Sequence, residues 1–177
     1  MRQEELKLVY SEDFMQNQSE ITEKMRAYLI DWLTELHLKF KLWPETLYVA
    51  IGIIDRFLQA EPDFKKKDLQ CLGITAMQIA GKYEEIYPPE LKHLLKVTDN
   101  VISKDNVLKL EHKILIKLDF NLTYPSIFRF MERYARIAQV SDKTLLLAQY
   151  FCDTCLLDCT LMKELPSKLA AISIYAA

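Results

Sequence analysis

Four cysteines are the residues of this chain best suited to bind a soft metal or to form disulfides. Cys152, Cys155 and Cys159 are spaced three and four residues apart, which on a helix would place their thiols on one face. A structural zinc site normally takes four Cys or His ligands, however, and no fourth ligand lies nearby in the sequence. We therefore expect buried free thiols, no metal site and no cofactor.

The side chains that could act in acid–base chemistry do not form a familiar catalytic motif. His37, His93 and His112 are scattered, and the carboxylates of Glu84-Glu85 lie beside Lys82 near a predicted helix end. The chain has only three glycines, too few for a glycine-rich phosphate-binding loop. We expect surface or helix-packing histidines and solvated carboxylates, and the pattern favours an interaction module over an enzyme.

The composition predicts an all-α fold. Half of the 177 residues are hydrophobic, and glycine and proline are few beside Leu, Ile, Ala, Lys and Glu. A formal net charge of −2 gives no general attraction for phosphate backbones, so we do not expect nucleic acid as a partner. The chain has neither a signal-peptide pattern nor an uncharged stretch of about 18 residues, so we expect no membrane association and an intracellular protein.

Apolar residues recur at helical spacing in segments separated by short breaks. After a weakly amphipathic start near residues 4–15, the predicted helices cover residues 19–42, 44–58, 67–86, 91–97 and 103–119. The pattern then restarts, with helices over residues 126–139, 142–158 and from 166 onward. Ser103 and either Ser141 or Asp142 are predicted N-caps.

The helix starts repeat at a fixed spacing along the chain. Asp142 follows Pro44 by 98 residues, and Pro166 follows Asp68 by the same distance. Two copies of one helical unit are therefore predicted. The chain stops in mid-pattern at Ala177, so we expect the second copy to be incomplete.

The third helix of each copy is rich in small residues. In the first copy it contains Gly73 and Gly81, although a glycine inside a helix costs about 0.5–1 kcal/mol relative to alanine. In the second copy it contains Ala170 and Ala171. Small side chains allow neighbouring helices to approach closely, so we predict a central third helix surrounded by the others.

Four segments resemble the signature motifs of the cyclin family, in the same order and at the same spacing. They are Met25 to Leu33, Ile53 to Leu58, Lys82 to Glu90 and Leu110 to Leu115. Residues 98–100 and 130–134 are similar to the mitotic, B-type branch. The resemblance implies tandem five-helix cyclin folds: an N-terminal helix or extension (1–23), a first fold (24–123) and a truncated second fold (124–177), in a fragment that lacks the N-terminal regulatory region.

The resemblance further implies a non-enzymatic subunit that binds and activates a cyclin-dependent Ser/Thr protein kinase in G2/M control, in the nucleus and cytoplasm. The first fold would hold the kinase's regulatory helix in its active orientation. In the family, a lysine and a glutamate that match Lys82 and Glu111 pair and hydrogen-bond to the kinase backbone. The residues that match the apolar pocket for a kinase side chain are Ile79, Tyr83, Leu115 and Leu122.

The resemblance also implies a shallow surface groove that recruits substrates and inhibitors carrying an Arg-x-Leu motif. The matching residues are Met25, Tyr28, Leu29, Trp32, Glu35, Leu69 and Gln70. Helical spacing alone would assign the first four to the core, whereas the resemblance places them on the surface, with an acidic rim for the arginine. Tyr28 replaces the isoleucine usual in the family, which would make the groove narrower or more polar. Arg26 and Asp55 match a buried structural ion pair.

Two other functions stay open. Some transcription factors that bridge promoter DNA and polymerase also use tandem cyclin folds, but they should show a basic DNA-facing surface and often a zinc ribbon, and this sequence has neither pattern. A helical scaffold that does not activate a kinase is the second alternative. Such a scaffold would have little reason to keep both Lys82 and Glu111.

Overall fold

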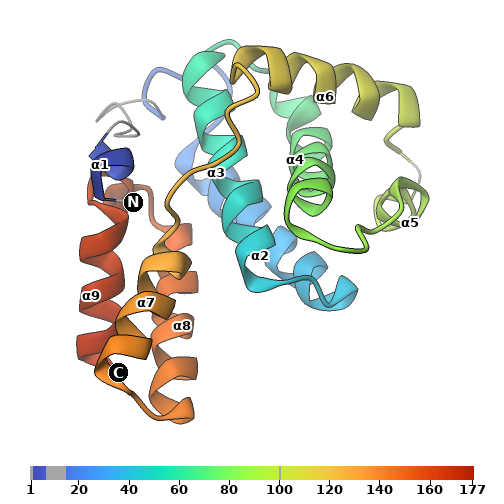
Figure 1. Ribbon diagram of the computed structural model, residues 1–177. Helices are drawn as coiled ribbons and strands as arrows, with labels where there is room; N and C mark the ends of the chain where they lie inside the picture. Colours follow the sequence, from blue (N-terminus) through green and yellow to red (C-terminus); the bar gives the residue numbers. More distant parts are fainter. Residues whose placement is uncertain (1, 7–14, 100) are drawn as a thin grey trace. The chain divides into compact units, whose positions relative to one another are not determined.

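The computed structural model describes residues 2–6, 15–99 and 101–177, and the regular structure in these ranges is entirely helical (Figure 1). The prediction of an all-α fold is confirmed. Residues 15–122 form one compact unit, and residues 2–6 together with 123–177 form another. Among the described residues, no helix is both long enough and apolar enough to span a bilayer.

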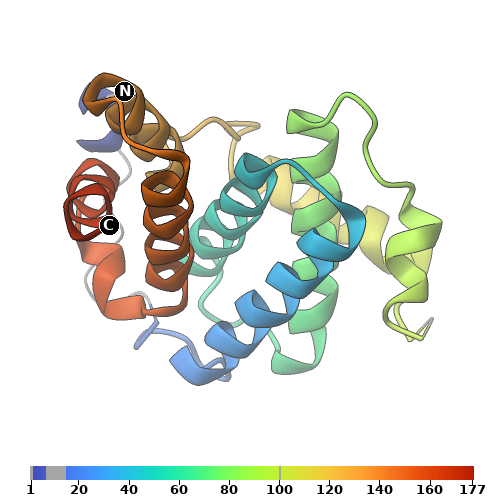
Figure 2. The ribbon, with the colours of Figure 1, turned by 90° about the horizontal axis from the view of Figure 1, so that it is seen from below.

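The unit of residues 15–122 is built around one buried helix. Its elements are α2 (Glu23–Phe40), α3 (Pro44–Ala60), the 3-10 helix η2 (Lys66–Asp68), α4 (Leu69–Glu84), α5 (Leu91–Lys96) and α6 (Lys104–Lys117). Figures 1 and 2 both show α4 between α3 and α5, and α4 also contacts α2 and α6. Every residue from Cys71 to Gly81 is buried, as expected for a central third helix.

Close approach of α2 to α4 occurs at a glycine. A Cβ atom placed on Gly73 would lie 2.8 Å from Cδ1 of Leu29 and 3.4 Å from Cδ2 of Leu33. At the other end of α4, a Cβ atom on Gly81 would lie 3.2 Å from Cδ of Pro89. The prediction that small residues allow close packing around this helix is therefore confirmed.

Local capping decides where the helices begin and end. The hydroxyl of Thr22 accepts a hydrogen bond from the Met25 amide, so α2 begins four residues later than predicted. Lys41 takes the left-handed conformation, with φ of 53°, and ends the helix. Ser103 and Ser141 cap α6 and α8 by accepting amide hydrogen bonds of 3.2 Å each, as predicted.

The second unit contains α1 (Arg2–Glu5), α7 (Ile127–Ala138), α8 (Asp142–Leu157), the 3-10 helix η3 (Cys159–Lys163) and α9 (Pro166–Ala176). Helix α7 contacts both α8 and α9, and α1 contacts α9. Glu5 is buried, and its Oε2 accepts a hydrogen bond of 3.0 Å from the amide of Ser167 in the first turn of α9. Most of the weakly amphipathic stretch near residues 4–15 lies outside the described residues.

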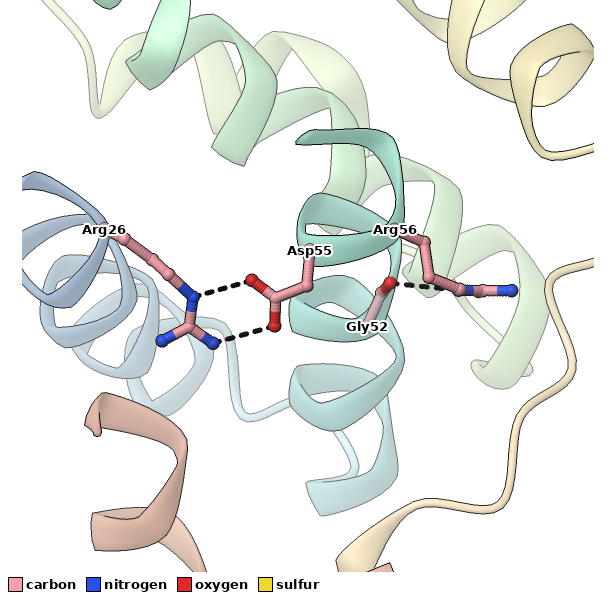
Figure 3. Close-up of polar contacts among 4 residues, drawn as sticks. All are labelled: Arg26, Gly52, Asp55 and Arg56. Carbon is pink, nitrogen blue, oxygen red and sulfur yellow. Dashed lines mark hydrogen bonds and ion pairs between the residues drawn. The ribbon is translucent and has the colours of Figure 1, made fainter. Parts of the chain in front are cut away.

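A buried ion pair links α2 to α3 (Figure 3). Nε of Arg26 donates to Oδ1 of Asp55 at 2.6 Å, and Nη2 donates to Oδ2 at 2.7 Å. The two side chains are only 1% and 4% exposed. Parallel hydrogen bonds of this kind fix both the distance and the orientation of the two groups, so the pair sets how α2 lies on α3.

We expect Arg26→Met to lower the free energy of unfolding by about 3–5 kcal/mol, because it leaves the Asp55 carboxylate buried without its cation. The double variant Arg26→Met/Asp55→Leu should be much less destabilised, since it removes both charges. Urea unfolding followed by circular dichroism measures the difference. Equal losses in the single and double variants would show that the lone carboxylate is not the cause.

Candidate functional site

Lys82 and Glu111 form an ion pair at the surface between α4 and α6. Nζ of Lys82 lies 2.7 Å from Oε1 and 3.0 Å from Oε2 of Glu111. The Lys82 side chain is 48% exposed, whereas the Glu111 side chain is 14% exposed. Exposed ion pairs typically contribute less than about 1 kcal/mol to stability, so folding alone gives little reason for this one. An ammonium has three donors, so Lys82 can also bind an acceptor outside the chain.

The apolar residues predicted beside this pair differ in exposure. Tyr83 is 46% exposed, and Leu115 on α6 is half-buried. Lys82 and Tyr83 lie on α4, and Glu111 and Leu115 lie on α6. These two helices pack against each other. Ile79 is only 3% exposed and belongs to the core of the unit.

Leu122, the remaining residue predicted to contact a kinase, does not lie on either of these helices. It follows α6 in a turn and is half-buried. Its position therefore depends on the conformation of residues 118–121 rather than on helix packing.

The residues predicted to dock substrates lie on α2 and at the start of α4, two helices in contact. Helical spacing alone favours a buried position for Tyr28. Tyr28 is 62% exposed, so that assignment is wrong for this residue. Nζ of Lys24 lies 5.7 Å from the centre of the Tyr28 ring. Of the other members of the set, the buried ones are Leu29 and Leu69, the half-buried ones Met25 and Trp32, and the exposed ones Glu35 and Gln70.

Glu85 has a role that the sequence interpretation missed. Its Oε1 accepts hydrogen bonds from the amide of Trp43 at 2.7 Å and from the hydroxyl of Thr46 at 2.5 Å. The prediction of a solvated carboxylate is therefore wrong for this residue, which attaches the end of α4 to the start of α3. A signal was present: α3 begins with Trp43-Pro44, which provides no side-chain cap of its own.

Glu85→Ala should lower the free energy of unfolding by about 1–2 kcal/mol, the usual effect of removing an N-terminal cap. Glu85→Gln keeps an acceptor oxygen and should lose less. Urea unfolding gives the stability, and hydrogen exchange of the Trp43 amide reports the hydrogen bond directly. Unchanged exchange in the alanine variant would contradict this role.

The cysteines do not share one helical face. Helix α8 ends at Leu157, and Cys159 lies beyond it in η3. None of the four cysteines, all of them in the described ranges, forms a disulfide, but only Cys71 and Cys152 are buried, so the prediction of uniformly buried thiols is wrong for Cys155 and Cys159. Within the described ranges, no group of three or more His, Cys, Asp or Glu side chains is arranged to hold a metal ion.

We expect the thiols to differ in reactivity. Burial raises the pKa of Cys152 to about 12 and also raises the pKa of Cys71. Because the thiolate is the reactive form, iodoacetamide at about pH 8 should leave both residues unmodified in the folded chain and should label the half-buried Cys155 and Cys159 before them. Peptide mass spectrometry over time, with a urea-unfolded control, checks the order. Rapid labelling of native Cys152 would contradict it.

Comparison with known proteins gives matches along nearly the whole chain. Residues 1–123 match the family model for the N-terminal domain of cyclins, and residues 125–177 match the model for the cyclin C-terminal domain. The chain is 41% identical over 165 residues to Cyclin-B2-3 of Arabidopsis thaliana, a match that covers 93% of this chain and 38% of the relative. It is 41% identical over 174 residues to the G2/mitotic-specific cyclin-B of Spisula solidissima, covering 98% and 40%. The chain thus spans about two fifths of the length of these curated relatives.

The fold is similar to that in the X-ray structure of a viral cyclin from herpesvirus saimiri. The TM-score is 0.88, and the match covers 99% of this chain and 78% of the viral chain at 19% sequence identity. At this identity the likeness concerns the fold alone. Together with the two matched domain models, it confirms the predicted class of tandem cyclin folds.

Proposed function

This chain belongs to the cyclin family, and from this membership we propose that it binds and activates a cyclin-dependent Ser/Thr protein kinase in G2/M control, in the nucleus and cytoplasm. The chain would act as a regulatory subunit with no chemistry of its own. The surface ion pair of Lys82 and Glu111, beside the exposed Tyr83, is the observation that carries the proposal. The net charge of −2 and this retained pair favour kinase binding over a DNA-bridging factor or a passive scaffold.

The two charged side chains and the apolar ones would contribute differently to binding. Lys82 offers donors and Glu111 offers acceptors to backbone groups of the kinase, which favours one register of the two proteins. Burying the exposed half of the Tyr83 ring and the exposed part of Leu115 would supply on the order of 1 kcal/mol each. Apolar contact therefore adds affinity, and the ion pair also fixes the orientation of the two proteins.

Activation follows from holding the regulatory helix of the kinase in place. An active kinase needs its strand lysine paired with a glutamate of that helix, so that the phosphates of ATP are positioned for transfer. A subunit that binds this arrangement about 5.5 kcal/mol more tightly than the inactive one would shift the kinase from mostly inactive to mostly active.

The exposed part of α2 is our proposed substrate-docking surface. Tyr28 is largely exposed and Trp32 half-buried, so their rings present apolar surface that could receive the leucine of an Arg-x-Leu motif. Glu35 is exposed on the same helix and could receive the arginine. Lys24, whose ammonium lies over the Tyr28 ring, would have to move or share that ring with the peptide.

Lys82→Ala and Glu111→Ala should each reduce activation of a cell-cycle kinase by roughly 10- to 100-fold, since each removes charged hydrogen bonds at the proposed interface. The measurement is phosphorylation of a generic kinase substrate as the chain is titrated into the kinase. Lys113→Ala is a matched control, because Lys113 is also 48% exposed and also pairs with a glutamate, Glu61. Circular dichroism shows whether each variant remains folded.

Two results would count against the proposed function. Failure of the unmodified chain to bind or activate any of several cell-cycle kinases would refute it. A loss of activation in Lys113→Ala equal to that in Lys82→Ala would show that the effect reflects a general loss of surface charge rather than the proposed contact.

A further inference from the structure

The turn after α6 has an unusual backbone. Asp119 and Phe120, two consecutive residues other than glycine, have positive φ angles of 50° and 54°. Residues with a Cβ atom seldom adopt this left-handed region, and two in succession are rarer. The Phe120 side chain is 63% exposed, and Asp119 and Asn121 are exposed too. Burial of these three side chains therefore does not account for the conformation.

Backbone hydrogen bonds define the turn itself. The Phe120 amide donates to the carbonyl of Leu115, and the Asn121 amide donates to the carbonyl of Leu118, both at 2.9 Å. The Leu122 amide donates to the carbonyl of Phe120 at 3.1 Å. The first two bonds use carbonyl groups left over at the end of α6, as in other helix ends that close with left-handed residues, and the third lies within the turn.

Arg56 on α3 supplies a tertiary contact to the same turn. Its Nη1 donates to the carbonyl of Asn121 at 2.7 Å, and its Nη2 lies 3.4 Å from the carbonyl oxygen of Leu122. Its Nε donates to the carbonyl of Gly52 at 3.0 Å, which orients the guanidinium on its own helix. Figure 3 shows that Arg56 points to the opposite side of α3 from its neighbour Asp55.

We propose that Arg56 is a positioning residue, which holds residues 119–122 in the left-handed turn and thereby sets the position of Leu122. The inference rests on the proposed function, because Leu122 is one of the residues predicted to contact the kinase. Two adjacent carbonyl groups require two donors at a fixed spacing. The planar guanidinium provides them on two separate nitrogen atoms in a fixed fork, whereas the donors of a lysine ammonium all leave from one nitrogen.

General attachment of α3 to α6 does not require Arg56. Lys113 and Lys117 of α6 both pair with Glu61 at the end of α3, at 3.0 and 3.2 Å. Removing the Glu61 charge therefore weakens the contact between these helices without touching the turn. This makes Glu61→Gln a matched control for variants of Arg56.

Hydrogen exchange in the free chain tests the first step of the proposal. Arg56→Lys should speed exchange of the Phe120, Asn121 and Leu122 amides by at least ~10-fold, while the interiors of α3 and α6 stay protected. Phe120→Gly added to Arg56→Lys should restore much of the protection, since glycine adopts positive φ without a steric cost. Glu61→Gln should leave exchange in the turn unchanged.

Either of two exchange results would overturn the proposal. One is exchange in Arg56→Lys equal to that of the unmodified chain. The other is an even increase along the whole of α6, which would show that Arg56 acts only through the general stability of the unit.

A double-mutant cycle on kinase affinity tests the second step. Arg56→Lys and Leu122→Ala should each weaken binding of a cell-cycle kinase by roughly 10-fold, and the double variant should bind no more weakly than Leu122→Ala alone. Additive effects would mean that Arg56 does not act through Leu122 and would overturn this step. If the unmodified chain binds no kinase, the proposed function fails, and the exchange measurement still decides whether Arg56 holds the turn.

Discussion

The enclosure of α4 by α2, α3, α5 and α6 is the constraint on which both proposed interaction surfaces depend. Leu69 and Gln70 lie at the start of α4, which contacts α2, and Lys82 and Tyr83 lie in its last turn, where Lys82 pairs with Glu111 of α6. Gly73 has no side chain where Leu29 of α2 approaches, so the spacing of these helices is set by direct contact with the backbone. A shift of α4 would therefore move both surfaces together.

Helix α3 is the second fixed element of this unit, and polar contacts attach it on several sides. Arg26 binds Asp55 on one side, and Arg56 reaches the turn after α6 on the other. Glu85 binds the start of the helix, and Glu61 at its end pairs with Lys113 and Lys117. The hydrogen bond from Lys113, followed by that from Lys117, lowers the pKa of the Glu61 carboxyl, so its contribution to stability is present at neutral pH and is lost as the pH falls through this lowered pKa.

The ion pairs of this unit differ in burial, and burial separates their roles. The Arg26–Asp55 pair is almost completely excluded from water, so losing one partner leaves a charge that no solvent can compensate. The Lys82–Glu111 pair is open to solvent through its lysine, so water reaches the Lys82 ammonium and screens the pair. Exposure thus leaves the second pair available for a partner protein, whereas the first pair serves the fold.

The sequence by itself determined the helical class, the order of the helices, two of their caps and the family motifs. These features depend on residues close together in the chain. The Ser103 hydroxyl caps α6 by accepting from an amide only three residues further on, and apolar periodicity identifies a helix before the helices that pack against it are known. Only the tertiary structure decided that Ile79 is buried and that Glu85 and Arg56 bind groups 42 and 65 residues away. The physical reason is that helical spacing defines a face but not what covers it. A hydrogen bond across the fold also depends on backbone positions that no local pattern specifies.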